Sequence, residues 1–186
     1  STVSGNTTLY DGGGLYVGGT STLQAVNTTV ANNHAVDQGG ALYLGGTSAT
    51  FTNATVAGNT ADTEAGSVLV QSQGALTLNN SIFADNTSSG GTDGVVNYGQ
   101  ADALASLIDT DSGNFTSLTN TLTGVDPALG PLGAHGGPTQ TMVPAGGSPV
   151  RDQGLRHSGV VAPSREVDRA PAVLSPGVHI RTVGDE

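Results

Sequence analysis

Acidic side chains recur at one point of a repeating pattern, shortly before segments that begin with small residues and continue with apolar ones. The recurring acids are Asp11, Asp37, Asp62, Glu64 and Asp93. If the pattern follows a structural repeat, these carboxylates line one edge of the molecule, where their oxygens can bind Ca²⁺. A carboxylate cluster can also perform the acid/base chemistry of polysaccharide hydrolysis. Because Asp is an ordinary turn residue, a solvated turn with no cofactor is the interpretation we favour, with calcium as the alternative.

Large apolar side chains form a second column within these apolar segments. They are Tyr16, Tyr43, Leu69 and Val96. Side chains alternate along a strand, so Leu15 and Val17 are expected to point inward and Tyr16 outward. Exposed apolar surface usually marks an interface. We therefore expect this column to be covered by residues 125–186, to stack on sugar rings or to contact a partner protein.

Basic residues are absent from most of the chain, whose net charge is -10. All five are arginines beyond residue 150: Arg151, Arg156, Arg165, Arg169 and Arg181. The absence of fixed positive charge from residues 1–150 argues against binding of nucleic acid or anionic membranes there. It also removes the Lys or Arg that a polysaccharide lyase would use as a base. Cysteine chemistry is excluded, and no metal-ligand spacing links the histidines, His34, His135, His157 and His179.

The elements that must position these residues follow from a repeat marked by asparagine. The marker residues are Asn6, Asn33, Asn59 and Asn86. Successive markers are 26 or 27 residues apart. Repeats of this length, each with short apolar strands, indicate a solenoid. We expect an all-β, right-handed parallel β-helix of about four to five coils over residues 1–124. Asparagine tolerates left-handed turns and can bond the same amide in the next layer, so these four residues are predicted to form a structural ladder.

The composition changes to proline and glycine after residue 124, and the repeat does not continue. Residues 125–186 are therefore predicted to form an irregular segment that packs on the β-helix or extends from it. No apolar run in the chain reaches membrane-spanning length, so we expect no direct membrane insertion.

A family resemblance is carried by three pieces of this last segment, DPALGPL at 126–132, GGPTQT at 136–141 and GSPVRDQG at 147–154. Together they resemble the C-terminal part of choice-of-anchor Q domain proteins, which are right-handed β-helix proteins of bacterial and archaeal surfaces. The upstream copies, with GGALY at 39–43 and TVAGNT at 55–60, also resemble the repeats of polymorphic outer-membrane proteins.

The resemblance implies a surface or exported protein, for which the family has no single established activity. The chain departs from the family pattern beyond Gly154, where residues 166–171 are an eroded version of the usual Asp-Ile-Gly-Ala strand. An anchoring mode is therefore not implied.

Two functions follow from these observations. The first is a non-enzymatic extracellular or cell-surface structural or adhesive module, whose partners are other copies of itself or another surface protein. Ser1 begins within the repeat pattern, and an uncapped coil presents unpaired backbone groups. This predicts either that an upstream region has been removed or that chains stack end to end into filaments. The alternative is a carbohydrate-active β-helix that binds or cleaves polysaccharide. That function requires aromatic and acidic residues in one groove, whereas we expect the two columns at different points of the coil.

Overall fold

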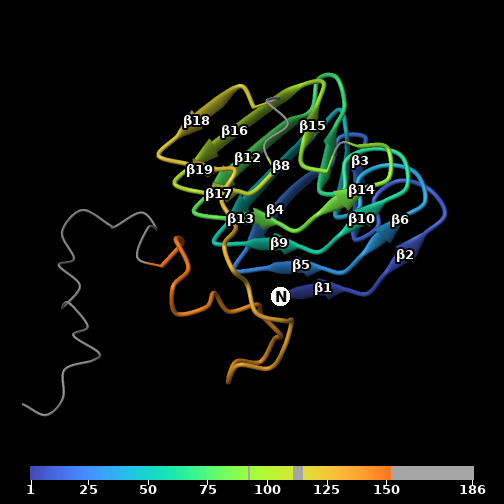
Figure 1. Cartoon of the computed structure of the whole chain (residues 1–186). Coiled ribbons are helices and arrows are strands. Elements are labelled where there is room, and N and C mark those ends of the chain that lie inside the picture. The colour runs from blue at the N-terminus through green and yellow to red at the C-terminus, as the bar shows by residue number, and fades with distance from the viewer. Residues whose placement is uncertain (92, 111–114, 152–186) are drawn as a thin grey trace, which may run out of the picture. The chain divides into compact units, whose positions relative to one another are not determined.

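The computed structural model describes residues 1–91, 93–110 and 115–151, and every regular element in them is a β-strand (Figure 1). The first coil contains β1 (Thr2–Ser4), β2 (Thr7–Thr8), β3 (Leu15–Gly18) and β4 (Thr22–Val26). The second contains β5 (Thr29–Ala31), β6 (His34–Ala35), β7 (Leu42–Gly45) and β8 (Ser48–Thr52). The third contains β9 (Thr55–Ala57), β10 (Thr60–Ala61), β11 (Val68–Val70) and β12 (Ala75–Asn79). The fourth contains β13 (Ile82–Ala84), β14 (Thr87–Ser88), β15 (Val96–Asn97) and β16 (Gln100–Leu104). The chain then adds β17 (Leu107–Ile108), β18 (Ser117–Thr119) and β19 (Leu122–Thr123).

Strands at the same place in successive coils pair in parallel and build four sheets. Sheet A contains β1, β5, β9, β13, β17 and β19, and sheet B contains β2, β6, β10 and β14. Sheet C contains β3, β7, β11 and β15, and sheet D contains β4, β8, β12, β16 and β18. The predicted parallel β-helix is thereby confirmed. Sheets A and D continue beyond the fourth coil, whereas the described residues add no further strand to sheets B and C.

The core consists of apolar side chains stacked in register inside the coils. In sheet C, Leu42 pairs with both Leu15 and Val68. Sheet A contributes a second column, Val3, Val30, Val56, Phe83 and Ile108. Phe51 of sheet D meets Phe83 edge to face, with ring centroids 5.7 Å apart. Full burial of each Val, Leu or Phe stabilises the fold by about 1.5–3 kcal/mol, so thin layers suffice to hold the coils together.

Glycine before sheet C permits the close approach of successive coils. A Cβ atom on Gly40 would lie 2.4 Å from the carbonyl oxygen of Gly66, and one on Gly66 would lie 2.3 Å from the carbonyl oxygen of Thr87. Any side chain there would push neighbouring backbones apart. The glycines of the repeat therefore set the tight turn that leads from sheet B into sheet C.

Residues 125–151 run back along the solenoid on the side of sheet A (Figure 1). The segment is folded on itself by antiparallel bridges between Leu129 and Pro144 and between Gly133 and Thr141. It reaches the first coil, where the Thr2 hydroxyl donates to the Gln140 carbonyl oxygen over 2.7 Å. Residues 125–186 were expected to cover the apolar column of sheet C, but residues 125–151 pack over sheet A instead. The remainder of that segment, residues 152–186, lies outside the described residues. The described residues contain no helix that could cross a membrane.

Candidate functional site

The four marker asparagines form a ladder inside the solenoid. The side-chain amide of Asn33 donates to Asn59 Oδ1 over 2.9 Å, and that of Asn59 donates to Asn86 Oδ1 over 2.8 Å. Asn6 donates to Asn33 Oδ1 in the same way at the exposed end of the column. Asn33, Asn59 and Asn86 are buried, so this ladder is structural and presents no surface for a ligand.

The left-handed turn residue is not the marker asparagine but the residue before it. Positive φ angles occur at Gly5, Asn32, Gly58 and Asp85. The marker side chain can point inward because its predecessor makes the turn. The sequence expectation that one residue does both was therefore wrong.

Tyrosines of two adjacent coils stack on the outer side of sheet C. The rings of Tyr16 and Tyr43 are 5.1 Å apart between centroids and within 5° of parallel. Tyr16 is 63% exposed, and glycines two residues further along each strand leave room for the rings: a Cβ atom on Gly18 would lie 3.0 Å from the Tyr16 ring, and one on Gly45 would lie 3.4 Å from the Tyr43 ring. The pair therefore presents aromatic surface to solvent.

The same column is closed in the next two coils. Leu69 and Val96 are 0% and 3% exposed and pack with Ala65, and Tyr43 lies against this cluster. In the apolar column predicted from the sequence, Tyr16 of the first coil is thus exposed to solvent, whereas Leu69 and Val96 of the third and fourth coils are buried. Ala65, in the turn before β11, contributes to their burial.

Tyr98, in the turn after β15, is a further exposed tyrosine, and it contacts one of the recurring acids. Its hydroxyl donates to Glu64 Oε1 over 2.8 Å, and the other oxygen of Glu64 accepts a bond from the Gln38 side chain at 3.3 Å. The hydrogen bond to Glu64 is the largest cause of a raised pKa of Tyr98, ahead of burial. A tyrosine that the sequence pattern did not select is therefore bonded to Glu64, one of the recurring acids.

Asp11 and Asp37 lie beside the tyrosine pair. Burial, and next the charge of Asp11, raise the pKa of Tyr43, while a hydrogen bond with the Gln71 side chain lowers it. Burial and then the carboxylate of Asp37 also raise the pKa of Asp11, whose Oδ1 accepts the backbone N–H of Gln38 at 3.3 Å. The acidic residues of the turn thus act electrostatically on the tyrosines of sheet C, although the two columns occupy different points of the coil. We call this surface, formed by Asp11, Tyr16, Asp37, Tyr43, Glu64 and Tyr98, the tyrosine face.

The other two recurring acids, Asp62 and Asp93, each contact a nearby polar group of the protein. Asp62 Oδ2 lies 3.7 Å from His34 Nε2 on sheet B, and Asp93 Oδ1 accepts the backbone N–H of Ser88 at 2.7 Å. In residues 1–91, 93–110 and 115–151, no three His, Asp or Glu side chains come together to hold a metal ion. The proposed calcium ligands therefore do not converge, and calcium binding stays a prediction.

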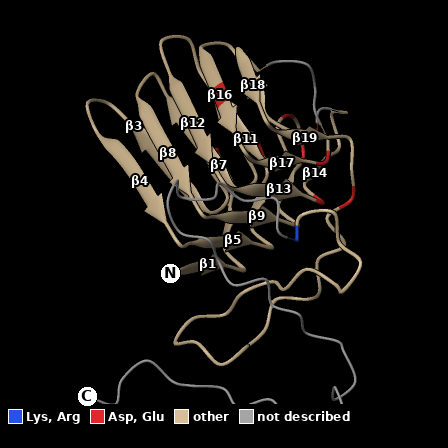
Figure 2. Ribbon diagram, turned by 90° about the vertical axis from the view of Figure 1, so that its left-hand side faces the viewer, with Lys and Arg blue, Asp and Glu red and all other residues tan. Residues whose placement is uncertain are grey.

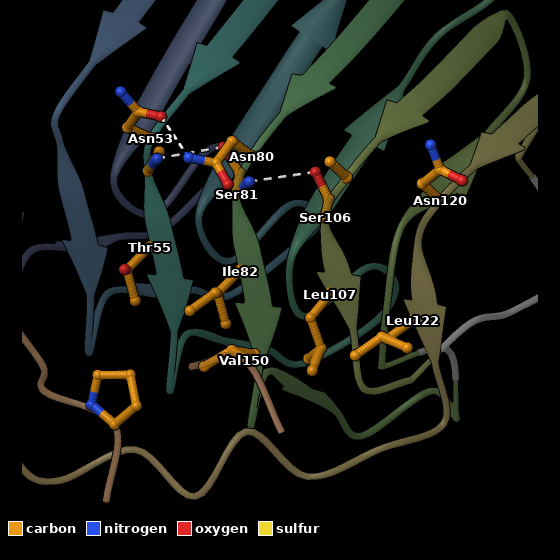
Figure 3. A pocket seen from close by; sticks show the side chains of 13 residues that line it. Asn53, Thr55, Asn80, Ser81, Ile82, Ser106, Leu107, Asn120, Leu122 and Val150 are labelled. Carbon is orange, nitrogen blue, oxygen red and sulfur yellow. Dashed lines mark hydrogen bonds between the residues drawn. The ribbon is translucent and has the colours of Figure 1, made fainter. Parts of the chain in front are cut away.

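A groove on the outer side of sheet A was not predicted from the sequence (Figure 3). It has a volume of about 300 Å³ and is lined by equivalent positions of successive coils together with Pro144 and Val150 of the C-terminal segment. One wall contains hydroxyls that accept backbone N–H groups of the preceding coil, Ser81 from Ala54 and Ser106 from Ser81, both at 3.1 Å. The signal in the sequence was the small or hydroxyl residue that follows each of the turn residues Asn53, Asn80 and Ala105.

Charge is sparse on the strands of the solenoid. Figure 2 shows the strands of sheet D side by side, with acidic colouring only on β16, where Asp102 lies.

No protein-family model matches this chain, and neither the curated proteins nor the solved structures contain a significant match. The resemblance to choice-of-anchor Q domain proteins therefore stays a prediction.

Proposed function

We propose that this chain is a non-enzymatic, extracellular adhesive module that holds a neutral polysaccharide on its tyrosine face. The observation that carries the proposal is the exposed, parallel Tyr16–Tyr43 pair. The charges of Asp11 and Asp37 act on Tyr43 and raise its pKa. Flat aromatic rings accept the apolar C–H faces of sugars, and carboxylates accept hydrogen bonds from sugar hydroxyls, which are stronger when one partner is charged.

The spacing of the surface favours an extended polymer. Neighbouring coils are about 4.8 Å apart, which is close to the advance of an extended hexopyranose chain per sugar. Tyr16 and Tyr43 occupy equivalent positions of two adjacent coils, so two consecutive sugars would contact equivalent rings. Contacts of this kind add along a chain and do not require a deep pocket.

The charge of the molecule favours neutral over acidic polymers. Residues 1–150 contain no Lys or Arg, and the tyrosine face itself carries Asp11, Asp37 and Glu64. Uronate or sulfate groups would meet like charge at this surface, which lowers both affinity and association rate. We therefore expect recognition of neutral glucans, mannans or xylans.

Affinity measurements on the intact chain test this proposal. Isothermal titration calorimetry with a neutral β-glucan oligosaccharide should give saturable binding, whereas polygalacturonate should give none. Tyr16→Ala should weaken binding about tenfold, equivalent to about 1.4 kcal/mol, because it removes the most exposed ring of the pair. Tyr10→Ala is the matched control, since Tyr10 is 77% exposed but lies outside the stack. Equal affinities of the two variants for the glucan would contradict the proposal.

Polysaccharide hydrolysis is a second candidate, favoured by the raised pKa of Asp11 next to Asp37. A pair of carboxyl groups is the arrangement that glycoside hydrolases use as acid and base. Release of reducing ends from neutral polysaccharide, lost in both Asp11→Asn and Asp37→Asn, would establish hydrolysis. Binding without release would leave the adhesive function.

A further inference from the structure

A second column of turn residues lies at the entrance to sheet A, on the outside of the solenoid. It contains one residue from each coil, namely Asn27, Asn53, Asn80, Ala105 and Asn120. All five have left-handed backbones, with φ between 48° and 52°. Their backbone N–H groups donate in the same register, Asn80 to Leu104 and Ala105 to Thr119, both at 2.9 Å. Ala105 therefore occupies the position that asparagine holds in every other coil.

The side chains of this column form a ladder with a fixed direction. The amide nitrogen of Asn53 donates to Asn27 Oδ1 at 3.3 Å, and that of Asn80 donates to Asn53 Oδ1 at 2.7 Å. Each amide oxygen thus faces the next coil. Because Ala105 has no amide, neither the side-chain oxygen of Asn80 nor the side-chain nitrogen of Asn120 has a side-chain partner in this column among the described residues. One rung of the ladder is missing.

The missing rung opens into the groove on sheet A. Figure 3 shows Asn80 and Asn120 on either side of the strand that begins after Ala105, with the side chains of Ile82, Leu107 and Leu122 below them. Val150 and Pro144 line the groove from the C-terminal segment. The volume of about 300 Å³ lies at the lower end of the range for small-molecule sites, which is about 300–1,000 Å³. The groove therefore combines the free side-chain oxygen of Asn80 and the side-chain amide of Asn120 with an apolar floor.

We propose that this gap binds an N-acetylated sugar, whose acetamido group replaces the missing rung. Asn80 and Asn120 are two coil spacings apart, or about 9.6 Å along the axis, which leaves room for one amide between their side chains. In a trans secondary amide the N–H and the C=O point in opposite directions. The ligand N–H donates to Asn80 Oδ1, and the ligand carbonyl accepts from Asn120 Nδ2.

The apolar floor distinguishes this ligand from other amides. The methyl group of an acetamido substituent lies against Ile82 and Leu107, and the sugar ring, on the opposite side of the trans amide, points away from them. A primary carboxamide would bring a second N–H without a partner, and unpaired polar groups in a groove weaken binding. A sugar without the N-acetyl group fills the same space but cannot bridge the two asparagines. The proposed site lies on sheet A, and it is independent of the tyrosine face on sheet C.

A single substitution fills the gap from the protein side. Ala105→Asn restores the rung in a backbone conformation that favours asparagine over alanine. It should therefore raise the Tm of the chain while abolishing ligand binding, so loss of binding cannot be ascribed to misfolding. Ala128→Asn is the matched control, because Ala128 also has a positive φ, of 49°, but does not line the groove. It should leave binding unchanged.

Methyl NMR titration with N-acetylglucosamine, using glucose as the control probe, gives the readout. N-acetylglucosamine should shift the signals of Leu107, Leu122 and Val150 in the wild type and in Ala128→Asn. Glucose should bind at least tenfold more weakly, and Ala105→Asn should show no saturable shift. Equal binding of the two sugars, no shift in the wild type, or undiminished binding by Ala105→Asn would each overturn the proposal. Tyr16→Ala should leave this response intact, which separates it from the function proposed for the tyrosine face.

Discussion

Replacement of Asn59 by alanine removes the central rung of the buried amide ladder. Its Oδ1 accepts bonds from the backbone and side-chain nitrogens of Asn33, at 3.1 and 2.9 Å. Its Nδ2 donates to Asn86 Oδ1 at 2.8 Å and to the Val30 carbonyl at 3.0 Å. Asn59 is 0% exposed, so water cannot replace these partners in the substituted protein.

The four lost hydrogen bonds set the expected magnitude. Each contributes about 1 kcal/mol net, and buried groups left without a partner add a further penalty. We therefore expect Asn59→Ala to lower the free energy of unfolding by about 4 kcal/mol. That is a large part of the 5–15 kcal/mol available to a domain, and the variant should be close to unfolding at ambient temperature.

Asn6→Ala is the matched control, because Asn6 is the exposed end of the same ladder and its side chain donates one bond, to Asn33 Oδ1. It should cost less than about 1 kcal/mol. Urea unfolding followed by circular dichroism measures both variants, with an unchanged m-value showing that the same surface is exposed on unfolding. If Asn59→Ala is no more destabilising than Asn6→Ala, the ladder does not hold the coils together and the reasoning fails.

Two further predictions concern single side chains. The Ser67 hydroxyl is buried without a hydrogen-bond partner among the described residues, and the equivalent residue of the second coil is Ala41. Ser67→Ala should therefore raise the free energy of unfolding by about 1 kcal/mol, as measured by urea titration. Replacement of the exposed Ser48 by alanine is the control and should leave the free energy of unfolding unchanged. Burial, then Asp109 and Asp126, raise the pKa of Asp85 above its ordinary 3.8. A raised carboxyl pKa destabilises the folded state at neutral pH, and this effect disappears as the pH falls through the raised value. Asp109→Asn should therefore lower the pKa of Asp85 in NMR titrations and raise the Tm at neutral pH, and an unchanged Asp85 titration would contradict the assigned cause.

The architecture was accessible from the sequence because one chemical pattern repeats at nearly constant spacing. The recurrence of asparagine at 6, 33, 59 and 86, with Leu15, Leu42 and Val68 in between, is enough to align the coils and to predict which side chains point inward. In a solenoid each residue packs against its equivalents in neighbouring coils, so local register determines most of the core.

The candidate binding surfaces were harder to predict from the sequence, because they depend on positions at which one coil of the repeat differs from the others. Four residues separate β11 from β12, but only two separate β15 from β16, and this shorter turn contains Tyr98, which bonds to Glu64. Ala105 matters because it lacks the amide that its equivalents have. Neither effect follows from residue type alone, since both require the register of neighbouring coils in three dimensions.

Tyrosine fluorescence tests the central claim most directly. The chain contains no tryptophan and four tyrosines, of which Tyr16, Tyr43 and Tyr98 belong to the tyrosine face. Titration with a neutral β-glucan oligosaccharide should change the emission saturably, and the midpoint should move to about tenfold higher oligosaccharide concentration in Tyr16→Ala but stay unchanged in Tyr10→Ala. An emission that stays constant while calorimetry records binding would place the polysaccharide elsewhere and contradict the proposed function of the tyrosine face.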